Sequence, residues 1–423
     1  MVREYKDSGI TWIGSIPKEW KTERIKALFS ERNERDCQGK TLLSVSQYFG
    51  IRPKSETDLA DSHIAESYDD YKEVRKGDFV MNIMLAWNGS YAVSDYDGIV
   101  SPAYCVFKFR KDCCKKYFHY LLRTDGYPSA FKTMSRGVID SRLRLYPEQF
   151  YTFPVIIPSV DEQQRIADYL DKKCAEIDGL IELQEQMIAQ LTDYKQSVIT
   201  EAVTKGLNPN VEFVPSGVDW IGDVPKGWRI AQTRRIVRNH LQGYYDADGY
   251  VTSGYRLLRI TDLLSNGNLS LENAPFVKET PNIKDFILQP GDFCFARTGG
   301  AGNFGFVSGD IEPAVFASYL IRFRFSGQNN NYLRYYFLSY SFISEVNSLI
   351  HGGVNKNIHA ENIKDTHLPL PPLSEQKSIA DYLDKECKEI DDLIAIKQQK
   401  IETLKEYKKS VIFEAVTGKI EIS

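Results

Sequence analysis

The reactive residue types of this chain fall into no catalytic or metal-binding pattern. Its six histidines form no HExxH and no His/Cys cluster, so no metal site is predicted. The Gly-rich run Thr298–Gly305 (TGGAGNFG) lacks the GK(S/T) of a phosphate-binding loop. It is either a tight turn between strands or a loop whose bare backbone can approach phosphates. The string nearest to the (N/D)PP(Y/F) loop of adenine methylation is Pro369–Leu373 (PLPPL), which has no Asn or Asp. We therefore predict no catalytic residue and expect function by binding.

Two long helical stretches, Asp161–Val203 and Ser374–Val416, are near copies shifted by 213 positions. Between Arg165–Ile181 and Ser378–Ile394, 13 of 17 residues are identical. Apolar residues recur at spacings of three, four and seven, which is typical of a narrow seam that packs against another helix. About 43 residues at ~1.5 Å each predict rods of roughly 65 Å. The predicted seam positions are Leu170, Ile177, Ile181, Ile188, Leu191, Val198, Leu383, Ile390, Ile394, Ile401, Leu404 and Val411.

A second repeat precedes the helices. Tyr5–Trp20 and Phe213–Trp228 share the pattern SG(I/V)xWIGx(I/V)PxxW, in which buried tryptophans and turn-forming Gly and Pro favour a packing strap over a binding motif. Each strap is followed by a variable region of short β-like runs and short helices. The expected strands are Thr41–Val45, Phe79–Met84, Tyr91–Val93, Tyr104–Phe109, Tyr255–Thr261, Asp292–Ala296, Gly305–Val307 and Leu320–Phe325, and the expected helices are Tyr117–Arg123, Tyr127–Met134 and Asn331–Leu349.

The order strap, variable region, long helix thus occurs twice and predicts a pseudo-two-fold internal repeat. We expect a strap and first domain at 1–158, a spacer helix at 159–206, a strap and second domain at 207–372, and a second spacer helix at 373–423. The variable regions are expected to be mixed α/β. The apolar seam of each long helix is expected to pack against the seam of the other. A coiled-coil spacer that touches no nucleic acid is the alternative for the helices taken alone.

The charge distribution separates the helices from the variable regions. The net charge is −4, but residues 21–150 carry +3 and residues 229–360 carry +3, whereas residues 161–205 carry −5. This is compatible with two domains that face DNA. No signal peptide and no apolar window long enough for a membrane span occur, and the seven cysteines have no CxxC spacing. A cytoplasmic protein with free thiols and no membrane partner is expected.

The ordered repeats resemble the specificity subunit of type I restriction–modification systems. The residues that carry the resemblance are both straps, GDFCFARTGGAGNFG at 291–305, GGVNKNIHAENIKDTHLPLPPLSEQ at 352–376, and the helix ends SVITEAV and SVIFEAV. The similarity covers nearly the whole chain. The first half departs from it at Arg136–Leu145, which lacks KNI, and at Phe153–Gln164, where FPVIIPSVDEQQ stands. This departure implies a different recognition subtype.

The resemblance implies two target recognition domains, each reading one half of a split double-stranded DNA target. They would be joined by two antiparallel helices that form a coiled-coil spacer and dock two methyltransferase subunits. Restriction/translocase subunits would complete the complex. No cofactor is expected in this chain, because S-adenosylmethionine, ATP and Mg belong to those partners.

Candidate DNA-contacting residues are polar or cationic and lie in irregular segments. Arg can make bidentate bonds to guanine, and Asn or Gln to adenine, while Lys neutralises phosphate. They are Gln47, Tyr48, Lys54, Asn88, Arg136, Arg142 and Arg144 in the first domain, and Arg259, Arg297, Thr298, Asn303, Lys356 and Asn357 in the second. Two other hypotheses remain open: a coiled-coil scaffold with two domains for ligands other than DNA, and a self-contained methyltransferase, against which the missing catalytic loop speaks.

Overall fold

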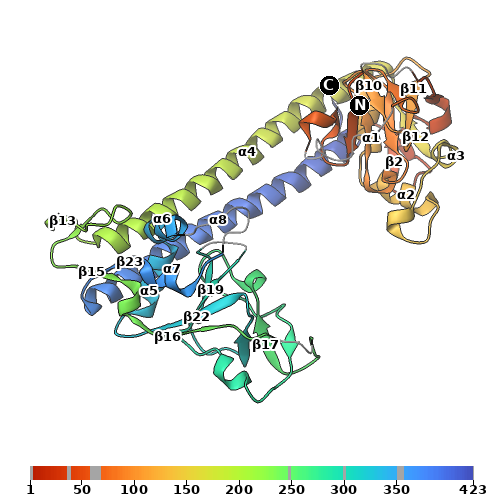
Figure 1. Ribbon diagram of the computed structural model, residues 1–423. Helices are drawn as coiled ribbons and strands as arrows, with labels where there is room; N and C mark the ends of the chain where they lie inside the picture. The colour runs from red at the N-terminus through yellow and green to blue at the C-terminus, as the bar shows by residue number, and fades with distance from the viewer. Residues whose placement is uncertain are drawn as a thin grey trace. The chain divides into compact units, whose positions relative to one another are not determined.

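The computed structural model describes residues 3–35, 40–57, 68–245, 249–298, 302–349 and 357–422. The chain divides into two compact units. Unit 1 contains Met1–Gln184 and Gln399–Ser423, and unit 2 contains Glu185–Gln398. Two long helices, α4 (Val160–Lys205) and α8 (Leu373–Val416), each contribute one half to each unit (Figure 1).

The globular part of unit 1 is built on a four-stranded antiparallel sheet in the order β4-β11-β8-β9. Phenylalanines from its strands pack against Phe150, which in turn contacts Phe131, in a buried aromatic core. Three of the predicted strands lie in this sheet. The elements of the unit are β4 (Phe29–Arg32), β5 (Leu43–Ser46), β6 (Gly50–Pro53), β7 (Lys72–Val74), β8 (Phe79–Asn82), β9 (Tyr91–Val93), β10 (Gly98–Val100), β11 (Tyr104–Phe109), α1 (Lys115–Leu122), α2 (Gly126–Met134) and α3 (Pro147–Phe150).

Unit 2 repeats this sheet with the order β16-β22-β19-β20. A second sheet, β18-β17-β21, contains the parallel pair β17 and β21. The elements are β16 (Val237–Gln242), β17 (Tyr255–Leu258), β18 (Phe276–Val277), β19 (Phe293–Ala296), β20 (Phe304–Phe306), β21 (Ala314–Phe316), β22 (Leu320–Phe325), α5 (Asn330–Leu338), α6 (Tyr340–Leu349) and α7 (Ala360–Asp365).

The single helix predicted over Asn331–Leu349 is wrong, because the chain forms two helices that meet at Ser339. Ser339 is extended, and its hydroxyl accepts the backbone N–H of Phe342 at 3.3 Å. A serine that caps a new helix in this way competes with continuation of the previous one. The periodicity of the apolar residues continues across the break and therefore conceals it.

A buried aspartate holds the turn into the central strand of each sheet. The carboxylates of Asp78 and Asp292 each accept the backbone N–H three residues earlier at 2.9 Å. Arg32 donates to Asp78 at 2.7 Å, and Arg324 donates to Asp292 at 2.6 Å. Arg32 belongs to β4, whereas Arg324 belongs to β22. The aspartate of the GDF sequence at 77–79 and 291–293 is therefore paired with an arginine from a different strand in each unit. Buried carboxylates need such partners.

Each strap packs against the start of a long helix. The hairpin of β1 (Tyr5–Asp7) and β2 (Ser15–Pro17) brings the indole N–H of Trp20 to Glu162 at 2.8 Å. The hairpin of β13 (Phe213–Pro215) and β14 (Asp223–Pro225) does the same for Trp228 and Glu375 at 3.1 Å. Both straps are therefore packing elements, as predicted. After each strap, the chain forms a strand that pairs with the strand preceding the long helix of the same domain. These pairs are β3 (Lys21–Arg24) with β12 (Pro154–Ile157), and β15 (Arg229–Gln232) with β23 (His367–Leu370).

The two long helices are antiparallel within each unit. In unit 1, Lys408 pairs with Asp178 at 2.7 Å, and in unit 2, Lys195 pairs with Asp391 at 2.7 Å. These ion pairs occupy the same repeat positions, since each residue of α8 lies 213 positions after its counterpart in α4. At the start of α4, the hydroxyl of Ser159 accepts the N–H of Glu162 at 3.3 Å and so caps the helix N-terminus.

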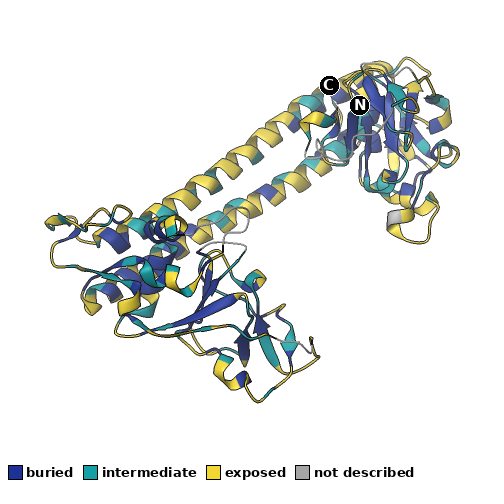
Figure 2. Ribbon diagram, in the orientation of Figure 1, coloured by how far each residue is buried: buried dark blue, intermediate teal, exposed yellow. Residues whose placement is uncertain are grey.

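The seam of the helices is most deeply buried where each helix half meets its domain. The middle of each helix is largely exposed (Figure 2). Of the predicted positions, Leu170, Ile177, Leu383, Ile390, Ile401 and Val411 are buried, and Ile181, Ile188, Leu191, Val198, Ile394 and Leu404 are half-buried.

Candidate nucleic-acid interface

In unit 2, four segments that are distant in sequence meet at the carboxyl end of β19. Ile358 donates its backbone N–H to the carbonyl oxygen of Arg297 at 2.8 Å. Arg297 donates its own N–H to the carbonyl of Tyr319 at 2.9 Å, and Ala296 donates to the carbonyl of Asn303 at 2.8 Å. These bonds fix the turn after β19, the start of β20, the turn before β22 and the segment before α7 at one edge of the sheet.

This edge presents polar side chains suited to base recognition. Asn303 and Asn357 are exposed, and Arg297 and Thr298 are half-buried beside them in the chain. Arginine and asparagine are the side chains that read guanine and adenine through paired hydrogen bonds. The predicted residues Arg297, Thr298, Asn303 and Asn357 thus lie on one edge, whereas Lys356 lies outside the described residues.

The corresponding edge of unit 1 has the same backbone connections. Leu145 donates its N–H to the carbonyl of Ile83 at 2.9 Å, and Ile83 donates to the carbonyl of Ala103 at 3.0 Å. Ile83 follows β8 as Arg297 follows β19, and Leu145 precedes α3 as Ile358 precedes α7. The segment that begins at Asn357 in the second half and the segment with three arginines in the first half therefore occupy the same place in the fold.

The arginines of unit 1 stand on a closed loop between α2 and α3. Arg136 and Arg144 exchange backbone hydrogen bonds of 2.9 Å in each direction. The side chains of Arg136 and Arg142 are exposed, and that of Arg144 is half-buried. Two exposed guanidinium groups at this edge can contact phosphate oxygens or a groove of DNA.

A second loop of unit 1, at the tip of the β5–β6 hairpin, lies beside the turn after β8. The guanidinium of Arg123 donates to the carbonyls of Gln47, Gly89 and Tyr91 and so ties the two segments together. Burial lowers the pKa of Arg123. Tyr48, at the tip, is 85% exposed, which leaves its ring free to stack or to donate a hydrogen bond.

Three predicted residues are engaged in internal contacts or lie apart. The side-chain oxygen of Asn88 accepts the N–H of Ser90 at 3.2 Å and its hydroxyl at 2.7 Å, so this residue shapes the turn. Arg259 donates to both carboxylate oxygens of Asp262, at 3.0 and 2.9 Å, and these hydrogen bonds raise its pKa. Lys54 is half-buried at the end of β6. The ion pair with Asp262 thus occupies the Nε and Nη2 atoms of Arg259.

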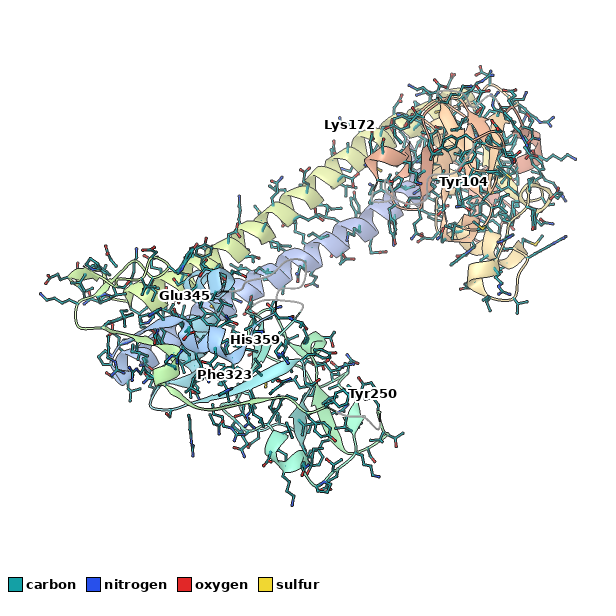
Figure 3. The ribbon with its side chains drawn as sticks, viewed as in Figure 1. Tyr104, Lys172, Tyr250, Phe323, Glu345 and His359 are labelled. Carbon is teal, nitrogen blue, oxygen red and sulfur yellow. The ribbon has the colours of Figure 1, made fainter. Side chains whose placement is uncertain are left out.

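Three exposed tyrosines of unit 2 were absent from the sequence-based candidates. Tyr319, whose carbonyl binds the amide of Arg297, is 61% exposed. Tyr245 and Tyr250 are also exposed, and Tyr250 stands at the surface of this unit (Figure 3). In the sequence each of them is only an aromatic residue just outside a strand. Aromatic residues in such positions are often buried in the core, so residue type alone does not indicate exposure. Exposed aromatic side chains offer flat surfaces for contacts with bases and sugars.

Within the described ranges, no group of His, Cys, Asp or Glu side chains is arranged to hold a metal ion. Six cysteines there are free, and burial raises the pKa of the Cys105 thiol to about 12, while Cys37 lies outside those ranges. No helix of the described part of the chain has the length and apolar character needed to span a membrane.

Comparison with known proteins gives a family whose members carry this architecture. Residues 17–193 and 254–406 match the family described as type I restriction modification DNA specificity domain. The chain is 24% identical over 426 residues to the type I restriction enzyme MjaVIII specificity subunit of Methanocaldococcus jannaschii, covering 96% of this chain and 94% of that protein.

Two solved structures share the fold. One belongs to a study of complex assembly and conformational transition of the type I R-M system; it has a TM-score of 0.71 and 16% identity and covers 96% of this chain and 99% of the other. The HsdS subunit from Thermoanaerobacter tengcongensis has a TM-score of 0.51 and 16% identity, with 96% and 98% covered. The expected fold class, two α/β domains joined by long helices in a repeat, is confirmed.

Proposed function

We propose that this chain, which belongs to the family of type I restriction-modification DNA specificity domains, reads a DNA target in two halves, one with each unit. The chain is a DNA sequence-specificity subunit. The main support for reading in two parts is that both units have the same edge of the sheet. In unit 2 the N–H of Ile358 donates to the carbonyl of Arg297, and in unit 1 the N–H of Leu145 donates to the carbonyl of Ile83. Each unit therefore has its own set of loops at the same point of the fold.

The two edges differ in chemistry, which supports two different half-sites. Unit 2 combines Arg297, Asn303 and Asn357, which suit reading of base edges. Unit 1 presents Arg136 and Arg142 instead, with an exposed tyrosine on the neighbouring hairpin. Because side chains at the base edges decide sequence preference, two unlike sets predict two unlike half-sites.

We further propose that α4 and α8 fix the spacing of the half-sites and dock partner subunits. Both helices run without a break across the division between the units. The exposed outer faces repeat: Leu180 is 46% exposed, and Leu393, its counterpart 213 positions later, is 47% exposed. Exposed apolar side chains at equivalent positions favour two copies of one partner.

In this proposal the partners are two methyltransferase subunits, together with restriction/translocase subunits, on double-stranded DNA. Catalysis, S-adenosylmethionine, ATP and Mg belong to those partners, and this chain contributes recognition only. A scaffold with domains for ligands other than DNA is not favoured, because the family and the relative are named for DNA or restriction specificity.

The proposal is tested by selection from a random duplex pool with the assembled complex. The expected product is a pair of fixed half-sites separated by a constant number of unconstrained base pairs. Binding should weaken steeply with salt, because phosphate contacts release counterions. Enrichment of one uninterrupted sequence, or binding that ignores sequence, would overturn the two-part reading.

A further inference from the structure

The loop between α2 and α3 of unit 1 holds two apolar side chains out in solvent. Val138 is 97% exposed and Ile139 is 54% exposed, and Figure 2 draws exposed residues at the tip of this loop. Leu143 and Leu145 of the same loop are buried. The loop therefore has apolar anchors of its own, and the exposed pair adds nothing to the core. Exposed β-branched apolar residues at the tip of an anchored loop point to a contact.

The loop is built to hold this shape. Arg136 and Arg144 close its base with two backbone hydrogen bonds of 2.9 Å. Gly137 has a φ of 153°, and a Cβ there would lie 2.5 Å from the carbonyl oxygen of Arg142, so only glycine fits the closure. The ammonium of Lys132 in α2 binds the carboxylate of Asp140 at 2.8 Å. The closed base and the glycine turn thus determine the shape of the loop, and the exposed ion pair with Lys132 adds a contact near its tip.

Cationic side chains flank the apolar pair, and the base of the loop joins the candidate interface. Arg136 precedes Val138 by two residues and Arg142 follows Ile139 by three, and both guanidinium groups are exposed. Leu145, at the end of the loop, bonds to Ile83 at the edge of the sheet. Proteins that deform DNA from the minor groove use this combination: an apolar wedge between base steps, with arginines on the adjacent backbone or in the groove.

We propose that Val138 and Ile139 form a wedge that enters the minor groove of the half-site read by unit 1 and unstacks one base step. Arg136 and Arg142 contact the DNA on either side of that step. The inference rests on the proposed function, because it requires that unit 1 binds DNA. Wedge insertion favours base steps that unstack easily, such as pyrimidine–purine steps, and it adds specificity without hydrogen bonds to bases.

The test uses the full chain in its assembled complex, on duplexes that contain the selected target. The fluorescent base 2-aminopurine is placed in turn at each position of both half-sites except the adenine that becomes methylated. Energy transfer between dyes at the duplex ends reports bending. The variants are Val138→Ser with Ile139→Ser, the apolar-preserving pair Val138→Ile with Ile139→Val, and Leu264→Ser as a matched exposed apolar control in unit 2.

The wild-type complex should raise 2-aminopurine fluorescence several-fold at one step of one half-site. The serine pair should lose most of that rise and of the bend, whereas the apolar pair and Leu264→Ser should keep both. Bound DNA with no unstacked step, or a serine pair that unstacks it fully, overturns the wedge and leaves the proposed function intact. Impaired assembly of the serine pair with normal unstacking assigns the patch to a protein contact and also overturns it. Absence of DNA binding by the wild-type complex would instead contradict the proposed function.

Discussion

Ile358 donates its backbone N–H to the carbonyl oxygen of Arg297 at 2.8 Å, although 61 positions separate them in the chain. This bond brings the segment with KNI to the turn after β19. Leu145 and Ile83 make the same bond in unit 1 at 2.9 Å. The two units thus share a backbone frame and differ in the side chains that it carries. That difference is what a two-part DNA reader requires.

Arg297→Ala should weaken recognition of only one half-site. Loss of a guanidinium that reads a base costs about 1–3 kcal/mol, or roughly 5–150-fold in affinity, and relaxes the preference at one position. Competition binding with duplexes mutated in either half-site measures this effect. Arg229→Ala, an exposed arginine in the separate β15–β23 pair, is the control and should change little. Equal loss at both half-sites would contradict the assignment of one half-site to each unit.

Insertion of seven residues into both long helices should lengthen the DNA spacer. The insertions follow Gln184 in α4 and Gln398 in α8, where each helix passes from one unit to the other. Seven residues add ~10 Å to a helix, and a base pair rises ~3.4 Å, so about three base pairs should be added. Selection from a random pool reports the spacing. An unchanged spacing in a folded double-insertion variant would refute the role of the helices as a spacer, and insertion into one helix alone should impair their pairing.

Trp20→Phe should destabilise unit 1 more than Trp228→Phe destabilises unit 2. The buried indole of Trp20 donates to Glu162 at 2.8 Å, whereas Trp228 is half-buried and donates to Glu375 at 3.1 Å. Phenylalanine keeps much of the apolar contact but leaves the carboxylate without this donor, which costs about 1–2 kcal/mol for the first variant. Urea unfolding measures both. Equal and negligible losses would show that the indole hydrogen bonds do not hold the straps.

Acid should destabilise unit 1 through His119. Burial lowers the pKa of this imidazole to about 3, with a contribution from the nearby Arg123, and its Nδ1 accepts the N–H of Val93 at 3.3 Å. The unfolded chain takes up the proton near pH 6.5, so the stabilisation is complete above 6.5 and declines as the pH falls toward 3. At pH 5 the loss is about 1–2 kcal/mol.

His119→Gln provides the comparison, because its amide oxygen can accept the same N–H and does not titrate. Urea unfolding at pH 7.5 and pH 5 should show a larger loss of unfolding free energy in the wild type than in this variant. Equal losses would show that His119 is not the titrating group responsible.

Local patterns in the sequence predicted both long helices and three of the four strands in each four-stranded sheet. Strands such as Tyr91–Val93 and Tyr104–Phe109 have the bounds expected from their β-branched and aromatic runs. The helix cap at Ser159 follows from its spacing to Glu162. The order of strands in the sheets did not follow, because pairing of β4 with β11 joins segments more than 70 residues apart and depends on packing of the whole domain.

For the candidate site too, the sequence indicates residue types, whereas contacts between distant segments decide which side chains are accessible. Arg297, Asn303 and Asn357 were selected by residue type, and the structure places them on one edge. Arg259 has the same residue type, but Asp262 binds its guanidinium. Tyr319 was missed because exposure of an aromatic residue beside a strand is decided by the turn that carries it. Residue type selects candidates, and only tertiary contacts decide which side chains remain available.

Methylome sequencing of cells with and without this chain, in the presence of the methyltransferase subunit proposed as its partner, tests the central claim most directly. The account predicts a methylated motif made of two fixed half-sites separated by a constant number of unspecified base pairs, and its disappearance when the chain is deleted. A continuous motif, or a methylation pattern that deletion leaves unchanged, would contradict it.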